Sequence, residues 1–261
     1  MKRLYKAYII VFLLCVACPA LKADGSSSEN EKLLQQAEKL LNNYKDSEAL
    51  LLYEQVIAAS ATNYEALCKA SFLHSRIGDR YSDETRKLKH FNKARQYAEM
   101  AYELDPSDAE ANYVMALALS SQAMVSGPKD RLTGINEVKS FLDAALNNNS
   151  EHAGAWHILG RWYFKMANLN FAEKAASKFF FGGLCEVVTN KNAADAMENA
   201  IKFEPNNIRY HYDLASIYNE MNDTTACITI LEKAVTLNLE TKEELELSRR
   251  CKIMLQEKKK R

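Results

Sequence analysis

The sequence predicts an all-α protein, a right-handed α-solenoid of the tetratricopeptide repeat (TPR) type with about five helix pairs and a C-terminal capping helix. Three observations support this class. An apolar pattern with a helical period fills residues 208–239, and the same spacing recurs upstream. Prolines and helix-capping residues separate the repeated stretches.

Residues 208–239 show the repeat most clearly. Counted from Ile208 as position 1, positions 4, 7, 8, 11, 20, 24 and 27 hold His211, Leu214, Ala215, Tyr218, Cys227, Leu231 and Ala234. This is the spacing of a TPR unit of about 34 residues, in which a short turn joins two antiparallel helices. Small residues at positions 8 and 20 let the two helices approach closely, and larger residues fill the space beside that contact.

The chain begins with a pattern typical of an export signal. Three basic residues precede an uncharged apolar run over residues 7–17, which is too short to span a bilayer as a stable helix. We expect cleavage after Ala23, so residues 1–23 form a signal peptide and the mature protein is periplasmic or secreted. Two alternatives stay open, namely a lipoprotein modified at Cys18, or an uncleaved segment that anchors the chain in a membrane.

The TPR domain is expected over residues 29–258, after a short linker at 24–28. A capping box of Ser28 and Glu31 starts its first helix, over residues 29–43. The predicted units are 30–63, 64–108, 109–152, 153–207 and 208–241, followed by a capping helix at 242–258 and a basic tail at 259–261.

The middle units carry insertions. About 11 extra residues lengthen the helices or the loop of the second unit, where Gly78–Asp79 is the expected turn. About 10 lengthen the third unit, in which Gly127–Pro128 breaks the helix, and about 21 lengthen the fourth. Further capping boxes are Ser107 with Glu110, and Thr241 with Glu244 at the start of the capping helix.

Charge and cysteine content exclude several classes. Without residues 1–23 the chain holds 30 Lys and Arg against 34 Asp and Glu, a balance that argues against nucleic-acid binding. The basic tail at 258–261 is interpreted as a solvated helix end. The remaining cysteines match no zinc pattern, and buried free thiols are favoured over a disulfide. They are Cys68, Cys185, Cys227 and Cys251.

The fourth unit resembles a known family. The residues that carry the likeness are Trp156-His157-Ile158-Leu159-Gly160-Arg161-Trp162, Ala167-Asn168-Leu169, Glu173-Lys174-Ala175-Ala176 and Phe180-Phe181-Gly182-Gly183. With the expanded second and third units, this segment is similar to the regulator of microtubule dynamics family. The resemblance implies an all-helical TPR domain used for binding. It covers about residues 30–255.

The chain departs from this family in two ways. It carries a bacterial-type export signal, and Leu184-Cys185 stand where relatives tend to have proline. Family members in animals are associated with microtubules, mitochondria and membrane contacts, and their TPR domain is linked to lipid handling. An exported protein would not meet microtubules, so only the fold and the binding role are carried over.

Helix A of each TPR unit lines the concave face through positions 2, 5, 9, 12 and 13, and these positions predict a basic, partly aromatic stripe. The predicted partner-binding residues are Arg76, Tyr113, His157, Arg161, Lys165, Arg209 and Tyr212. Such a stripe suits a carboxylate, a peptide C-terminus or a phosphate. In the alternative, Arg161 and His157 pair with inserted residues such as Glu173 and serve packing.

Phe179, Phe180 and Phe181 form a second unusual feature. Three adjacent aromatic residues cannot all face one side of a helix, so at least one docks elsewhere. The segment either folds over the solenoid or gives an exposed apolar contact for a partner or a membrane.

No catalytic, nucleotide-binding or metal-ligand motif occurs, so we expect no enzyme activity, no cofactor and no metal site. The predicted function is a non-enzymatic scaffold that binds a protein or peptide on its concave face. The alternative is that the insertions enlarge the groove for a lipid-like or other apolar ligand, with Arg161 holding a polar head group.

Overall fold

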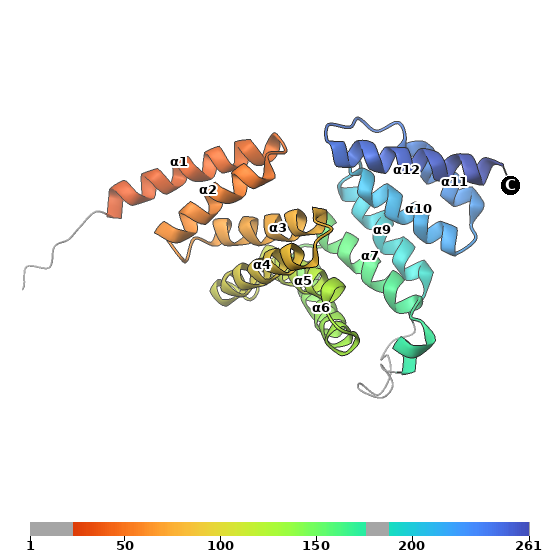
Figure 1. Ribbon diagram of the computed structural model, residues 1–261, viewed down its shortest axis with the longest axis horizontal. Coiled ribbons are helices and arrows are strands. Elements are labelled where there is room, and N and C mark those ends of the chain that lie inside the picture. Colours follow the sequence, from red (N-terminus) through yellow and green to blue (C-terminus); the bar gives the residue numbers. More distant parts are fainter. Residues whose placement is uncertain (1–22, 176–187, 261) are drawn as a thin grey trace, which may run out of the picture.

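The computed structural model describes residues 23–175 and 188–260, and the regular structure of these residues is α-helical without a strand (Figure 1). This confirms the predicted all-α solenoid. The helices are α1 (Ala23–Asn42), α2 (Asp46–Ala59), α3 (Tyr64–Arg80), α4 (Glu84–Leu104), α5 (Ala109–Val125), α6 (Pro128–Asn148), α7 (Ala153–Ala167), α9 (Asn190–Phe203), α10 (Ile208–Glu220), α11 (Thr224–Ala234) and α12 (Lys242–Lys259).

Small residues make the contact inside each helix pair. Ser71 Oγ of α3 donates a hydrogen bond to the Ala94 carbonyl oxygen of α4 at 2.8 Å. A Cβ atom at Gly160 of α7 would lie 3.2 Å from the Ala193 carbonyl oxygen of α9. Both pairs join position 8 to position 20 of a unit, so the helices approach most closely where the spacing predicts.

The second unit accommodates its insertion by lengthening α3 and α4, which leaves a turn of only three residues, 81–83. The expected turn at Gly78–Asp79 is therefore wrong. Gly78 lies buried inside α3, where a Cβ atom would be 2.6 Å from the ring of Phe91 in α4. The glycine thus allows two helices to touch rather than the chain to turn.

Helix caps agree with the sequence at one of three predicted boxes. Thr241 and Glu244 form the box that opens α12. At α5 the N-cap residue is Asp108 instead of Ser107. Its carboxylate accepts hydrogen bonds from two backbone N–H groups, and its negative charge is stabilised by the positive end of the helix dipole. Ser28 lies inside α1, which begins earlier than expected.

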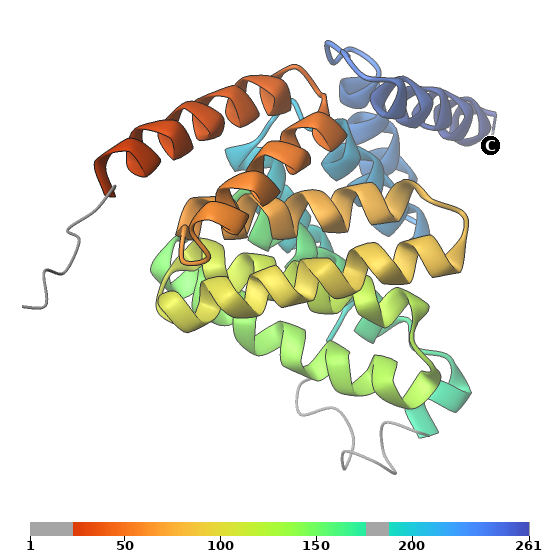
Figure 2. The same ribbon diagram turned by 60° about the vertical axis from the view of Figure 1, so that its left-hand side comes forward.

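The superhelix curls until the start of α12 returns to the first two units, as Figures 1 and 2 show. Arg80 Nε, at the end of α3, lies 3.1 Å from Glu243 Oε1 in α12. Tyr44 lies in the turn between α1 and α2, where burial and then the nearby Glu240 carboxylate raise the pKa of its hydroxyl. Side chains therefore join the two ends of the solenoid across its concave side.

Three cysteines are buried free thiols, in line with the favoured interpretation. Burial raises the pKa of Cys68 to about 12 and that of Cys251 to about 11, so both are protonated and unreactive near neutral pH. Cys227 Sγ lies 3.4 Å from the Ala215 carbonyl oxygen and fills the small position of the fifth unit.

Several predictions fall outside the described residues. These concern the signal segment with Cys18, the aromatic run at Phe179, Phe180 and Phe181, and Cys185. Among the helices that are described, none is long and apolar enough to cross a membrane.

A polar cluster lies between α2, α3 and α4. His74 Nδ1 is 2.9 Å from His90 Nδ1, and His74 Nε2 is 3.3 Å from Glu54 Oε1. The Tyr97 hydroxyl donates to the same glutamate oxygen at 3.0 Å. Burial lowers the pKa of both histidines, so both rings are neutral near pH 7 and one facing nitrogen donates to the other.

Substituting Gly78→Ala should lower the free energy of unfolding. The new methyl group would meet the buried Phe91 ring, and overpacking of this kind costs about 1–3 kcal/mol, against a helix-propensity gain of about 1 kcal/mol. The matched control is Gly134→Ala in α6, where the nearest side-chain atom is 4.0 Å away and stability should be kept or increased. Urea denaturation measures both, and equal effects would contradict the close contact.

Stability should also fall as the pH drops below about 6.5, the ordinary histidine pKa. Because the folded pKa values of His74 and His90 are lowered, the unfolded chain binds more protons in this window, and the stabilisation present above it is lost. His90→Gln should make the loss shallower. Urea midpoints between about pH 7 and pH 5 test this, and an unchanged slope in the variant would exclude the cluster as the cause.

Candidate binding groove

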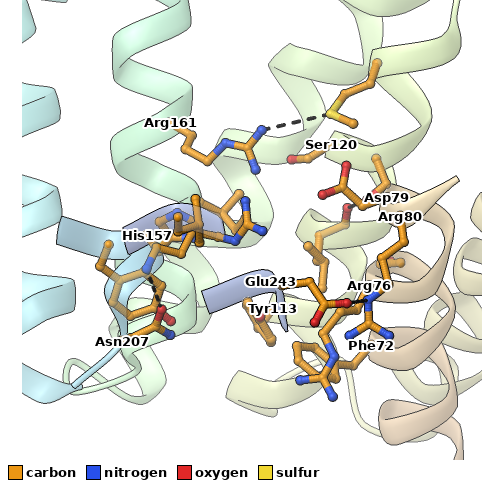
Figure 3. Close-up of a pocket in the computed structure, with 18 of the residues that line it drawn as sticks. Phe72, Arg76, Asp79, Arg80, Tyr113, Ser120, His157, Arg161, Asn207 and Glu243 are labelled. Carbon is orange, nitrogen blue, oxygen red and sulfur yellow. Dashed lines mark hydrogen bonds and ion pairs between the residues drawn. The ribbon is translucent and has the colours of Figure 1, made fainter. Parts of the chain in front are cut away.

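The concave face of the solenoid holds a cavity of about 720 Å³, which lies between α3, α5, α7, α10 and α12 (Figure 3). Its volume falls within the range of about 300–1,000 Å³ that is usual for ligand sites. Much of the wall is apolar. The apolar lining includes Phe72, Leu117, Met124, Ile158, Trp162 and Leu247.

The structure brings together six of the seven residues predicted to bind a partner. The six that line the cavity are Arg76, Tyr113, His157, Arg161, Lys165 and Arg209. Tyr212 does not line it. Its ring is half-buried against the C-terminal core because α12 packs on α10.

Counting TPR positions missed the contribution of the capping helix. Glu243, Glu244 and Leu247 of α12 line the cavity together with its N-cap residue Thr241, as does Tyr44 from the turn between α1 and α2. These residues reach the groove because the solenoid curls back on itself (Figure 1). Position counting within one unit carries no information about that curvature.

Among the described residues of the lining, five carry a positive charge, and three of these form ion pairs with neighbouring carboxylates. Arg76 and Arg80 both pair with the carboxylate of Asp46, which is only 2% exposed, and Arg80 Nη2 lies 2.6 Å from its Oδ2. Lys165 Nζ lies 2.6 Å from Glu173 Oε1. Charge-assisted contacts of this kind hold the three side chains against the wall.

Arg161 and Arg209 are the two cations of the lining that remain. Both are exposed, and neither makes an ion pair within the part of the chain that the structure describes. Arg161 Nη2 contacts the Met124 sulfur at 3.9 Å (Figure 3). The alternative in which Arg161 and His157 pair with Glu173 is not what the structure shows, because Glu173 binds Lys165.

The buried ring of His157 and the partly exposed Asp213 form a hydrogen bond, with Nε2 and Oδ2 2.7 Å apart. Burial lowers the pKa of His157 more than the carboxylate raises it, so the imidazole is neutral and donates its N–H. Burial opposes ionisation of Asp213. The bond from His157 and the charges of Arg161 and Arg209 nevertheless hold the pKa of that carboxyl below its ordinary value.

Ser75 lines the cavity, and its side-chain oxygen makes no hydrogen bond to the described residues. Its side chain is 3% exposed, and its Oγ has no hydrogen-bond partner among the residues that are described. Most buried polar atoms in proteins do have a partner. The Ser75 hydroxyl is therefore a buried polar group that the described residues leave unsatisfied.

The geometry defines the class of protein. Paired helices, small residues at their contacts and a concave cavity identify an α-solenoid of the TPR type. The regulator of microtubule dynamics protein 1-3 family matches residues 33–259. The chain belongs to this family.

Curated relatives agree with this assignment. The chain is 27% identical over 155 residues to regulator of microtubule dynamics protein 1 of Pongo abelii, a match that covers 59% of this chain and 44% of that protein. It is 24% identical over 194 residues to regulator of microtubule dynamics protein 3 of Mus musculus, covering 72% and 40%. The chain thus spans less than half the length of these relatives.

Solved structures show the same fold. A thermophilic TPR protein of Thermus thermophilus superposes with a TM-score of 0.64 at 16% identity, covering 87% of this chain and 99% of that one. The type IV pilus biogenesis factor PilW gives 0.53 at 14% identity, covering 87% and 86%. At these identities the likeness shows the fold alone.

Two substitutions measure how much the hydrogen bond between His157 and Asp213 contributes to the free energy of unfolding. His157→Phe keeps a buried ring but leaves the carboxylate without its donor, so the free energy of unfolding should fall by about 2 kcal/mol. Asp213→Asn keeps an oxygen acceptor and should cost about half as much. Urea denaturation compares them, and a larger loss in Asp213→Asn would refute this account.

Proposed function

We propose that this protein is a non-enzymatic scaffold whose concave groove binds an acidic peptide segment of a partner protein. The observation that carries the proposal is the presence in the cavity lining of two guanidinium groups without an ion pair among the described residues, Arg161 of α7 and Arg209 of α10. A guanidinium offers parallel N–H donors that match a carboxylate, and two of them hold an anion from two directions.

The supporting structure keeps these arginines available. The imidazole of His157 hydrogen-bonds the Asp213 carboxylate. The charge of this carboxylate attracts both guanidinium groups, but it forms an ion pair with neither. An incoming carboxylate therefore meets cations that need not break a pair first, which removes one cost of binding.

The apolar lining fits a peptide better than a free anion. The sulfur of Met124 contacts Arg161, and the apolar lining also includes Trp162 and Leu117, so an apolar side chain near the acidic group would bury its surface in the cavity. The fold and the curated relatives are those of TPR and regulatory proteins rather than of enzyme families, which supports a binding role.

A selection from a random phage-displayed library of peptides about 12 residues long tests this proposal. Peptides recovered on the wild-type chain should be enriched in Asp and Glu. Arg161→Glu combined with Arg209→Glu should weaken a recovered peptide by about 100-fold in fluorescence anisotropy, since two attractions become repulsions.

The control reverses two exposed lysines outside the cavity, Lys233→Glu with Lys252→Glu, which makes the same change in net charge. Affinity should stay within about twofold of wild type in this control. Equal losses in both double variants, or selected peptides without acidic residues, would count against the groove as the site.

A further inference from the structure

The described part of the cavity lining includes three carboxylates, and two of them form contacts with other residues. Glu243 forms an ion pair with Arg80 at 3.1 Å. Glu244 accepts the backbone N–H groups of Glu240 and Thr241 at 2.9 Å and so closes the cap of α12. Asp79 is exposed and makes neither a hydrogen bond nor an ion pair within the described part of the chain. One wall of the groove therefore presents an open carboxylate.

Helix stability does not explain this aspartate. Asp79 is the second-last residue of α3, and a negative charge is unfavourable at the C-terminal end of a helix dipole. No neighbouring cation offsets that effect, because Arg76 and Arg80 are directed to Asp46. The carboxylate thus stands where the fold gains nothing from it.

Asp79 faces Arg161 across the cavity. Figure 3 shows Asp79 on the α3 wall and Arg161 on the α7 wall, with both charged groups directed into the space between them. Ser75 lies one helical turn before Asp79 on the same face of α3, and its buried hydroxyl has no partner among the described residues. The α3 wall therefore presents the exposed carboxylate of Asp79 to the cavity.

We propose that the groove selects a bipolar peptide segment, with an acidic group on Arg161 and Arg209 and a basic group on Asp79. This inference rests on the proposed function and names the partner chemistry that the same groove prefers. A segment with acidic residues throughout would place a negative charge against Asp79, and that repulsion discriminates against it. Apolar side chains between the two charges would lie on the apolar wall.

Two synthetic probes separate this inference from the proposed function. The bipolar probe has two glutamates, three apolar residues and two lysines, and the acidic probe has glutamines in place of the lysines. Wild type should bind the bipolar probe about tenfold more tightly by fluorescence anisotropy. Asp79→Asn should abolish this ratio without weakening the acidic probe, and Asp79→Lys should reverse it.

The matched control is Glu103→Gln, which removes an exposed carboxylate of α4 outside the cavity and should keep the wild-type ratio. Urea denaturation checks folding, and Asp79→Asn should be at least as stable as wild type because it relieves the helix dipole.

Each outcome decides between the two ideas. A ratio that Asp79→Asn leaves unchanged overturns the bipolar inference, whereas the proposed function stands if Arg161→Glu with Arg209→Glu still weakens both probes. Equal binding of the two probes by wild type also overturns the inference. If wild type binds neither probe, both ideas are wrong.

Discussion

The close approach of paired helices at small side chains is the constraint on which the rest of this structure depends. Where Ser71 meets Ala94, and where Gly160 meets Ala193, no room exists for a larger residue. These contacts fix how each pair is inclined, and stacking repeats that inclination from unit to unit. The first helices of successive units consequently face one another across a single cavity. A groove built in this way inherits its shape from backbone contacts buried far behind its surface.

Charge is distributed within this groove more selectively than the balanced composition of the chain suggests. Two carboxylates, the buried Asp46 and Glu243 of the capping helix, together neutralise Arg76 and Arg80 on one wall, and Glu173 pairs with Lys165. Near Arg161 and Arg209, the neutral imidazole of His157 hydrogen-bonds the Asp213 carboxylate, which forms an ion pair with neither arginine. The result is a site in which attraction for an anion comes from a few positions. Formal net charge, which is zero for the whole chain, says nothing about such an arrangement.

The sequence predicted the fold class and most of the cavity lining because TPR spacing is a local rule that fixes which face of each helix looks inward. What it missed depends on contacts between distant residues. Gly78 suggested a turn, since a glycine that lets two helices touch looks the same in sequence as one that lets a chain bend. Tyr212 was misplaced, and the start of α12 was overlooked, because both depend on superhelical curvature, which accumulates from small rotations between units. The pairing of His157 with Asp213 joins two units and has no signature in either.

The contact between Arg80 and Glu243 changes how this solenoid should come apart. In an open array each unit senses only its immediate neighbours, so the terminal helices fray independently of one another. Here an ion pair joins the second unit to the capping helix, with most of the chain between them. Loosening at the C-terminus therefore removes a restraint from the N-terminal half, and the reverse also holds. Local unfolding at one end of the solenoid should therefore be coupled to local unfolding at the other end through this ion pair.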